Sequence, residues 1–495
     1  MDNPPKVAFH LELIIITNID SCGGILAGRN WRQVTIEVLP DNTILEIFDS
    51  YRLDTEGHVR GRPWKWHRLA HVCRRWRHVI YMSPRRLGLQ ILCKSGKSIE
   101  RVLGSWPTLP LVVGFKGSRK SKSLPKNIVI ALRHANRICR IDLGVTTRTS
   151  QSIADMIQVP FPALECIRVE SKDAAEPVVI SGFLGGSAPR LKEIHVEGIA
   201  IPFPALRQLL LSTYNLIRLV LKDIPKSCCF SPDALVDILS CLDHLEKLDI
   251  RFRPPASRST TNIEPSPPFG RSAFPSLFSL GFYGASEYLE AFVARSHMPA
   301  LLTLKIKFFN QVIFELPQLY GFMSRVEELK VFNSVYITPA AKSLNISFYQ
   351  RLNENLKPDY HRRACYLSVP CRQLDWQLSI TAQIFDQLTP LLSSAESLTI
   401  FEPLSMSTGR EDVDPAQWLE LFQPLSSLSE LRVNIKELVP DVVHALVNEN
   451  TAAGILPELT SLYLRGYRKS PSAIDAAKQF VSSRKLANRN ILLRS

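Results

Sequence analysis

Apolar residues recur along most of the chain in one short pattern, apolar-x-x-apolar-x-apolar. This pattern is typical of a turn that leads into a strand with one buried face. Successive copies mostly begin 24 to 33 residues apart, which fits one strand and one connecting segment per unit. The copies are Ile138-Ile141-Leu143, Leu164-Ile167-Val169, Leu191-Ile194-Val196, Leu206-Leu209-Leu211, Leu216-Leu219-Leu221, Leu245-Leu248-Ile250, Leu277-Leu280-Phe282, Leu301-Leu304-Ile306, Val326-Leu329-Val331, Ala395-Leu398-Ile400, Leu428-Leu431-Val433 and Leu459-Leu462-Leu464.

Predicted helices separate several of these strands. Three segments place an N-cap side chain directly before a proline, at Ser231-Pro232, Asp414-Pro415 and Ser470-Pro471. Such pairs commonly begin a helix, because the cap satisfies a free N–H and proline has none to satisfy. Alternating strands and helices bury their apolar faces only when neighbouring units stack. We therefore expect an α/β fold in which a curved parallel sheet carries its helices outside.

Two segments interrupt the repetition. A gap of 69 residues separates Val326 from Ala395, and we expect a loop excursion near 335–394. Proline, serine and threonine crowd the stretch from Arg253 to Arg271, which predicts a second excursion near 253–273. The alternative architecture, a doubly wound sheet with leucine-rich strands, would require glycine-rich loops after its strands, and these are scarce. The glycine-rich segment Gly182 to Ser187 lacks the lysine of a phosphate-binding loop, so we interpret it as a turn.

The N-terminal part of the chain has a helical pattern instead. After Pro40, apolar residues fall mostly on one side of a helix, at Ile44, Leu45, Ile47, Phe48 and Tyr51. A second run has steps of three and four, at Trp66, Leu69, Cys73, Trp76 and Ile80. Its other face is basic, with Arg68, Arg74, Arg75 and Arg77, and must stay in solvent unless partners pair with it. Pro84 then ends this helix.

This segment resembles an F-box, a small helical module. The matching residues are Leu39, Pro40, Ile44, Leu45, Ile47, Phe48, Leu69, Val72, Cys73, Arg75, Trp76, Ser83, Pro84 and Leu87. The resemblance implies that a Skp-type adaptor binds the module, with Trp76 in its core. The implied adaptor contacts are Leu39, Pro40, Ile44, Leu45 and Phe48. Asn42 departs from the family pattern, which has an acidic residue there. The alternative is an ordinary amphipathic helix pair within a larger domain.

The repeats from Ile99 to Ser495 resemble irregular leucine-rich repeats. They lack the asparagine that regular members place eight residues after the first leucine, where Lys172, Ile199, Ile224 and Arg253 stand instead. This departure argues against a smooth, uniform horseshoe. The two resemblances together divide the chain into an N-terminal extension over 1–36, an F-box-like helical module over 37–92 and a repeat domain over 93–495.

Composition narrows the functional class. The ten cysteines form no C-x-x-C pair, which argues against a zinc site and against a disulfide framework. We therefore expect reduced thiols and a cytoplasmic or nuclear location. The longest N-terminal apolar run, Leu11 to Ile19, contains Glu12 and is too short to cross a bilayer. No nucleophile elbow, phosphate-binding loop, H-E-x-x-H pair or dinucleotide fingerprint occurs, so we predict a non-catalytic chain without cofactor or metal.

The net charge of +14 raises the question of an anionic partner. In a solenoid, residues that alternate with the buried leucines face the inner surface. At such positions we expect Lys222, Arg251, Lys305, Lys307, Lys330, Arg432 and Arg465. We hypothesise that they receive an acidic or phosphorylated segment of a protein, although ordinary solvated side chains would give the same pattern. Nucleic-acid binding is the weaker alternative, because no aromatic stacking platform is evident.

These expectations combine into one hypothesis. The F-box-like module would bind the Skp-type adaptor of a cullin-RING ubiquitin ligase, and the repeats would hold an unknown protein substrate. The chain would then be a substrate receptor that supplies proximity. The alternatives are a leucine-rich-repeat interaction scaffold without a ubiquitin role and a basic repeat protein that binds nucleic acid.

Overall fold

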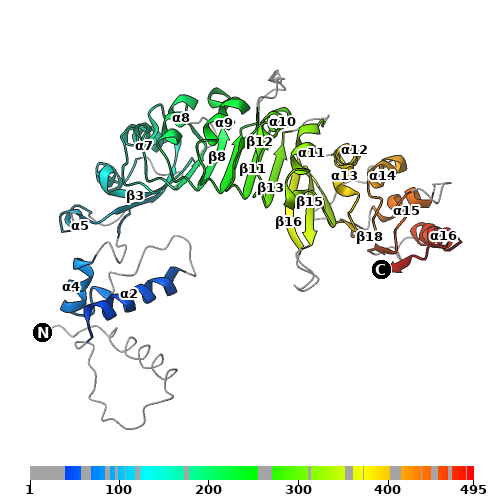
Figure 1. Cartoon of the computed structure of the whole chain (residues 1–495), viewed down its shortest axis with the longest axis horizontal. Coiled ribbons are helices and arrows are strands. Elements are labelled where there is room, and N and C mark those ends of the chain that lie inside the picture. Colours follow the sequence, from blue (N-terminus) through cyan, green and yellow to red (C-terminus); the bar gives the residue numbers. More distant parts are fainter. Residues whose placement is uncertain are drawn as a thin grey trace, which may run out of the picture.

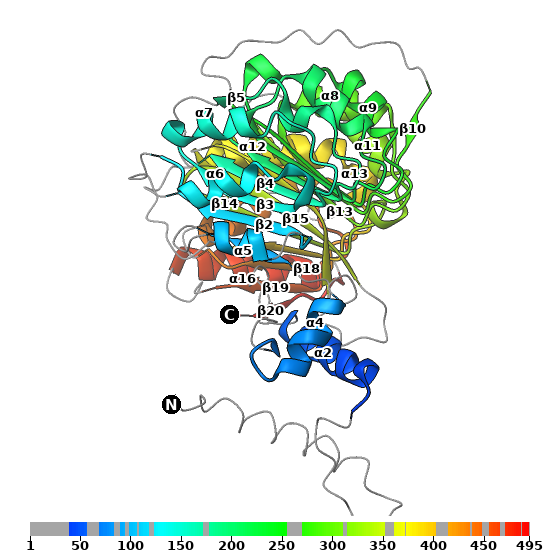
Figure 2. The same cartoon turned by 90° about the vertical axis from the view of Figure 1, so that its left-hand side faces the viewer.

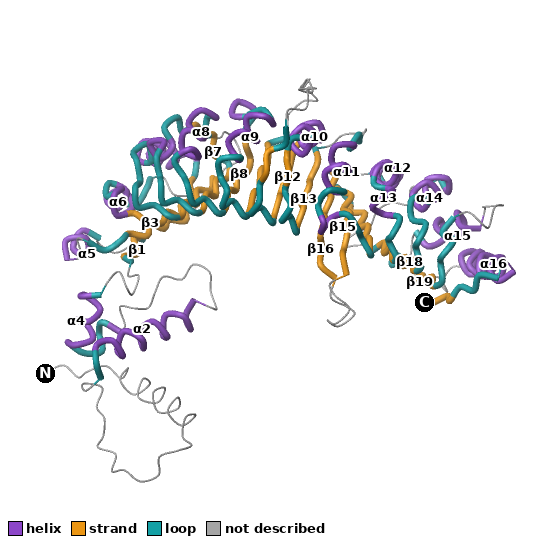
Figure 3. Tube along the Cα trace, in the orientation of Figure 1, coloured by secondary structure: helices purple, strands orange, loops and turns teal. Residues whose placement is uncertain are grey.

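A computed structural model describes most of the chain. The described residues are 39–56, 69–83, 90–94, 99–105, 108–117, 123–171, 178–254, 270–309, 314–351, 361–371, 373–401, 414–435, 438–447, 455–465, 471–486 and 488–494. They form an α/β structure in which a long, arched sheet follows two N-terminal helices (Figure 1). Helices lie along the outer side of the arch and strands along its inner side (Figure 3).

The sheet has sixteen strands in the described part of the chain, and most neighbours are parallel. In spatial order these strands are β1 (Ile91–Cys93), β2 (Leu111–Lys116), β3 (Ile138–Val145), β4 (Cys166–Ser171), β6 (Glu193–Glu197), β8 (Arg218–Ile224), β9 (Lys247–Phe252), β11 (Ser279–Gly284), β13 (Thr303–Phe308), β16 (His361–Val369), β15 (Ser343–Arg351), β14 (Ser334–Ala340), β17 (Ser397–Ile400), β18 (Glu430–Val433), β19 (Ser461–Leu464) and β20 (Leu492–Arg494). Two short pairs flank the sheet, β5 (Val178–Val179) with β7 (Ile199–Ala200) and β10 (Ser272–Ala273) with β12 (Ser296–His297).

Helices connect successive strands and cover one face of the sheet. They are α5 (Glu100–Ser105), α6 (Lys126–Leu132), α7 (Thr147–Met156), α8 (Phe203–Leu211), α9 (Pro232–Leu239), α10 (Ser286–Ala294), α11 (Pro317–Met323), α12 (Leu374–Gln387), α13 (Thr389–Leu392), α14 (Pro415–Phe422), α15 (Val439–Val447) and α16 (Pro471–Leu486). Short 3-10 turns, η3 (Ala135–Arg137), η4 (Phe183–Gly186), η5 (Lys226–Cys228) and η6 (Glu327–Leu329), complete the connections. Seen along the arch, α8, α9 and α11 lie outside the stacked strands (Figure 2).

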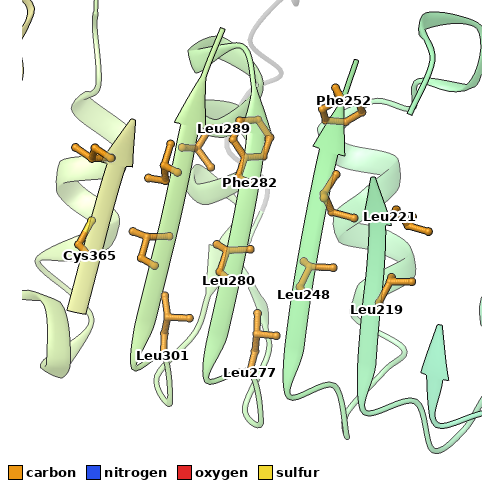
Figure 4. Packing of buried hydrophobic residues seen from close by; sticks show 14 of the residues in the cluster. Leu219, Leu221, Leu248, Phe252, Leu277, Leu280, Phe282, Leu289, Leu301 and Cys365 are labelled. Atoms are coloured by element: carbon orange, nitrogen blue, oxygen red, sulfur yellow. The ribbon is translucent and has the colours of Figure 1, made fainter. Parts of the chain in front are cut away.

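Buried and more exposed side chains alternate along the strands, and the buried ones form the core. Leu219, Leu248 and Leu280 occupy equivalent positions on neighbouring strands, and each is at most 2% exposed (Figure 4). Burying a leucine side chain contributes roughly 1.5 to 3 kcal/mol, so stacked units stabilise one another through this continuous apolar layer.

Ten of the twelve predicted apolar patterns run into strands of the sheet, and two do not. Leu206 and Leu209 lie in α8, where Pro202 precedes the helix and one helix face is buried. That prediction was wrong because leucines three apart fit a helix face as well as a strand. Val326 and Leu329 fall in and beside η6, and β14 begins only afterwards.

The 69-residue gap contains regular structure in place of the expected loop excursion near 335–394. Strands β14, β15 and β16 form an antiparallel meander, which α12 and α13 follow. The meander enters the sheet in reverse order, because β16 pairs with β13 and β14 pairs with β17. The curved sheet is therefore parallel on both sides of one antiparallel insert.

The predicted helix starts are confirmed where the structure describes them. Ser231 caps α9 by accepting a hydrogen bond from the N–H of Ala234, and Asp414 caps α14 by accepting one from Ala416. The glycine-rich segment forms the predicted turn at η4. Several other predictions fall outside the described residues, namely those on 1–36, Trp66, Arg68, Pro84, Leu87, Ser470 and the central part of 253–273.

Candidate functional site

The concave inner face of the sheet is the face opposite the helices. Its side chains alternate with the buried ones, so on β13 Lys305 and Lys307 are exposed whereas Leu304, Ile306 and Phe308 are buried. Because neighbouring strands are in register, equivalent inner positions form ladders across the sheet. One ladder joins Asp142, Arg168, His195, Val220, Asp249, Gly281, Lys305, Tyr366, Ser347, Tyr336, Thr399, Arg432 and Tyr463.

Cations on strands β4 to β9 of the inner face are mostly paired with carboxylates. Lys222 lies 3.0 Å from Glu197, and Arg251 holds both oxygens of Asp249 at 2.8 Å. The remaining pairs on these strands are Arg168 with Glu170 and Arg218 with Glu193. This part of the face is therefore largely charge-balanced.

One group on this face has the side chains of a metal site. Nε2 of His195 lies 3.6 Å from Glu170 Oε1 and 3.5 Å from Glu197 Oε2, so an imidazole and two carboxylates converge. Burial and the charges of Lys222 and Arg168 lower the pKa of His195, so its ring is neutral at pH 7. Both carboxylates already bind those two cations, which a metal ion would have to displace. We therefore interpret the group as a charge network.

A basic patch follows on β9 and β13, formed by Lys247, Lys305 and Lys307. None of the three makes an ion pair with any described residue. Burial and the nearby positive charges of Arg218 and Lys305 lower the pKa of Lys247, so the cations in and beside the patch disfavour one another. Lys307 lies 4.9 Å from the ring centroid of Tyr283. Asp249 is the one carboxylate whose charge acts on Lys247, and it pairs with Arg251, so the three lysines of the patch form no ion pair among the described residues.

Beyond the patch, the inner face contains a pocket of about 650 Å³, which we call the inner pocket. It lies over the antiparallel insert and the strands that follow, from β16 to β19. Its lining combines four aromatic rings, two guanidinium groups and five smaller polar side chains. These are Tyr336, Tyr349, Tyr366, Phe401, Arg432, Arg465, Thr338, Asn345, Ser347, Thr399 and Asn434.

The seven predicted inner cations therefore fall into separate environments. Lys222 and Arg251 are paired, Lys305 and Lys307 belong to the basic patch, and Arg432 and Arg465 line the inner pocket. The prediction that Lys330 faces inward is wrong. This residue follows η6 outside the sheet strands and pairs with Glu327 at 2.6 Å, so it does not lie on the inner face.

The two N-terminal helices, α2 (Asp41–Glu56) and α4 (Arg74–Met82), form a helix pair. The ring of Phe48 meets Trp76 edge to face, with centroids 4.8 Å apart, and Trp76 is fully buried. Arg75 donates hydrogen bonds to the carbonyl of Leu39 and to the carboxylate of Asp41, which fixes the entry into α2. Leu69 is helical but residues 70–73 are not, so the predicted second helix is interrupted before α4.

The five adaptor contacts implied by the resemblance are not equally accessible. Ile44, Leu45 and Phe48 are each at most 5% exposed, and Phe48 packs against Trp76 of α4. Leu39 is half-buried and Pro40 is exposed, so these two can reach a partner. The three buried residues cannot contact an adaptor while the helix pair stays packed.

Other apolar side chains of the helix pair are exposed. Met82 is 71% exposed at the end of α4, Tyr81 is 39% exposed, and Val72 is 41% exposed just before the helix. A single exposed apolar side chain needs no partner, but three on the same helix pair as Leu39 and Pro40 offer apolar area that a partner could cover. These residues extend the accessible apolar surface beyond Leu39 and Pro40.

Sequence reasoning missed the aromatic part of the inner pocket. Tyr336 and Tyr349 lie in the 69-residue gap, for which a loop was expected. The signal was present, since Val335 and Ile337 alternate with polar residues and Ile346 and Phe348 do the same. A period of two predicts strands even where the longer repeat is broken.

Comparisons with known proteins do not assign the chain to a family. No protein-family model matches the chain, and no curated protein matches it either. Within the described residues, every helix is too short or too polar to span a bilayer.

Proposed function

We propose that the chain is a substrate receptor of a cullin-RING ubiquitin ligase. In this role the helix pair binds a Skp-type adaptor, which links the chain to the cullin scaffold, and the inner face holds the protein to be ubiquitinated. The chain supplies proximity and orientation in place of chemistry.

One observation carries the proposal. A helix pair with an accessible Leu39-Pro40 start and a buried Trp76 precedes a curved sheet whose inner face is uncovered in the described structure. The two parts offer separate surfaces, one apolar on the helix pair and one polar and charged on the sheet. A protein that bridges two partners requires two such surfaces.

The test is co-expression with a Skp-type adaptor followed by affinity purification. We expect the wild-type chain to retain the adaptor, and we expect Leu39→Asp and Met82→Asp each to abolish retention, because a carboxylate cannot be buried cheaply in an apolar interface. Phe48→Asp is unsuitable, since that residue is 2% exposed and its loss would disrupt the helix pair.

Leu492→Asp is the matched control. Leu492 is a 53% exposed leucine on β20, at the far end of the sheet, and its change should leave adaptor retention intact. Absence of the adaptor from wild-type preparations would refute the ligase role and favour an interaction scaffold. Salt-sensitive binding to duplex DNA would favour the nucleic-acid alternative, against which the charge pairing on β4 to β9 argues.

A further inference from the structure

The inner pocket has two chemically different ends. Arg432 on β18 and Arg465 directly after β19 form one end, and three tyrosines on β14, β15 and β16 form the other. No carboxylate is among the described residues that line it. The pocket therefore favours a ligand that is anionic at one end and flat and apolar at the other.

The cationic end presents two guanidinium groups to the same space. Arg432 lies opposite Tyr463 in the ladder, and Arg465 is two residues further along the chain, so the two arginines are diagonal neighbours. One strand spacing of about 4.8 Å and two residues of about 3.3 Å each put such positions roughly 8 Å apart at Cα, within the reach of two arginines that share one oxyanion. Arg432 also contacts Glu430 at 2.9 Å, whereas Arg465 is exposed and pairs with none of the described carboxylates.

The aromatic end is held in place by its own contacts. The ring of Tyr336 lies 4.8 Å from that of Tyr349 and 6.2 Å from that of Phe401, both by centroid. Asn345 accepts hydrogen bonds from Tyr366 at 2.8 Å and from Ser368 at 2.9 Å. Rings fixed in this way offer flat apolar contact at a small cost in conformational entropy.

The distance between the ends sets the length of the ligand. Strand β14 is separated from β18 by β17, so two strand spacings, about 10 Å, lie between Tyr336 and Arg432. An extended peptide advances about 3.3 Å per residue, so this distance corresponds to about three residues. The basic patch on β13 adjoins the aromatic end, since Lys305 pairs in register with Tyr366.

We infer that the inner pocket binds a peptide segment with an anionic residue and an aromatic residue about three positions apart. The anionic group, a carboxylate or a phosphate, pairs with Arg432 and Arg465, and the aromatic ring packs among Tyr336, Tyr349 and Phe401. This inference deepens the proposed receptor role, because it names the class of protein segment that the inner face would hold.

Selection from a phage library of random dodecapeptides on the immobilised full chain tests the inference. We expect enriched sequences to combine Asp or Glu with an aromatic residue two to four positions away. The affinity of an enriched peptide is then measured by fluorescence anisotropy. Arg432→Glu and Arg465→Glu should each weaken binding by about tenfold or more, since each replaces an ion pair with a repulsion. Tyr336→Ala should weaken binding and abolish the selection for aromatic residues.

Arg140→Glu is the matched control, because it makes the same charge change on an exposed strand position of the inner face, at β3. It should leave the affinity within about twofold, while melting curves confirm that all variants are folded. Replacing the peptide's acidic residue by phosphoserine separates the two sources of anion: tighter binding indicates a phosphorylated segment, and equal or weaker binding an unmodified acidic one.

Enriched sequences without acidic residues, or an equal loss of binding in Arg140→Glu, would overturn the inference. Adaptor retention is measured separately and depends on the helix pair. A failure of peptide binding is therefore distinguishable from a failure of the receptor role.

Discussion

Gly185 shows how a single backbone position supports the turn between two repeats. Its φ is +56°, and an added Cβ would lie 2.7 Å from the nitrogen of Pro160 and 2.8 Å from the carbonyl carbon of Val159. Backbone atoms cannot yield as a flexible side chain can. We expect Gly185→Ala to lower the free energy of unfolding by about 1 to 3 kcal/mol, measured as a loss of thermal midpoint.

Gly104 is the matched control for that substitution. It lies in α5, and an added Cβ would meet nothing within 4 Å. Because glycine is a poor helix former, Gly104→Ala should raise the free energy of unfolding by about 0.5 to 1 kcal/mol. Shifts of the same sign in both variants would contradict the assignment of strain to Gly185.

At the residue scale, alternation predicted which cations face inward but not what they bind. Lys222 and Arg251 lie on the inner face as expected, yet Lys222 pairs with Glu197 on a neighbouring strand, and strand register is needed to predict that contact. The helical spacing of apolar residues likewise predicted the apolar face of α2. It could not tell a face buried inside the chain from one that a partner would cover, as Ile44 and Phe48 show.

At the element scale, Glu290 couples α10 to α11. Its carboxylate accepts hydrogen bonds from the N–H groups of Gln318 at 2.7 Å and Leu319 at 2.8 Å, which have no partner within the first turn of α11. Burial nonetheless raises the pKa of Glu290 to about 7. The folded chain therefore binds a proton more tightly at this site than the unfolded chain, whose glutamate titrates near 4.3.

This difference predicts a pH dependence with a definite sign. Between about pH 4.5 and 7 the folded state holds more protons at Glu290 than the unfolded state, so the free energy of unfolding falls as pH rises. From pH 5 to 8, the titration of Glu290 should lower the free energy of unfolding by about 1 to 3 kcal/mol, after allowance for its partial exposure. Glu290→Gln should remove it, as measured by urea denaturation at both values.

Glu287→Gln is the control on the same helix, because that glutamate is exposed. It should keep the wild-type difference between pH 5 and 8. If Glu290→Gln also kept that difference, the assignment of the titration to Glu290 would be wrong.

Elements were predictable from sequence where two signals agreed. Apolar spacing and a cap with proline together located α9 and α14. Where only the apolar spacing was present, as at Leu206 to Leu211, helix and strand could not be separated, because the same leucines satisfy both periods. The order of β14, β15 and β16 depends on pairing between distant segments, which no local pattern encodes.

At the scale of the whole molecule, the arch has an exposed edge at each end and must protect its core there. Helix α16 covers the C-terminal end of the helix layer, where it packs on α15 and buries Ala477 and Phe480. Arg484, 2% exposed, donates a hydrogen bond from this helix to the carbonyl of Ile455. Terminal units of stacked repeats generally need such a cap, because each unit buries its neighbour.

Deletion of residues 471–495 would remove both α16 and β20. The side of α15 that α16 covers would then face solvent, and β19 would become an edge strand with unpaired N–H and C=O groups. We expect the shortened chain to self-associate, as measured by size-exclusion chromatography with light scattering. Leu492→Asp, which leaves α16 in place and adds a charge to the edge strand, should elute as the wild type does. A shortened chain that stayed monomeric with an unchanged melting temperature would show that the arch is stable without a C-terminal cap.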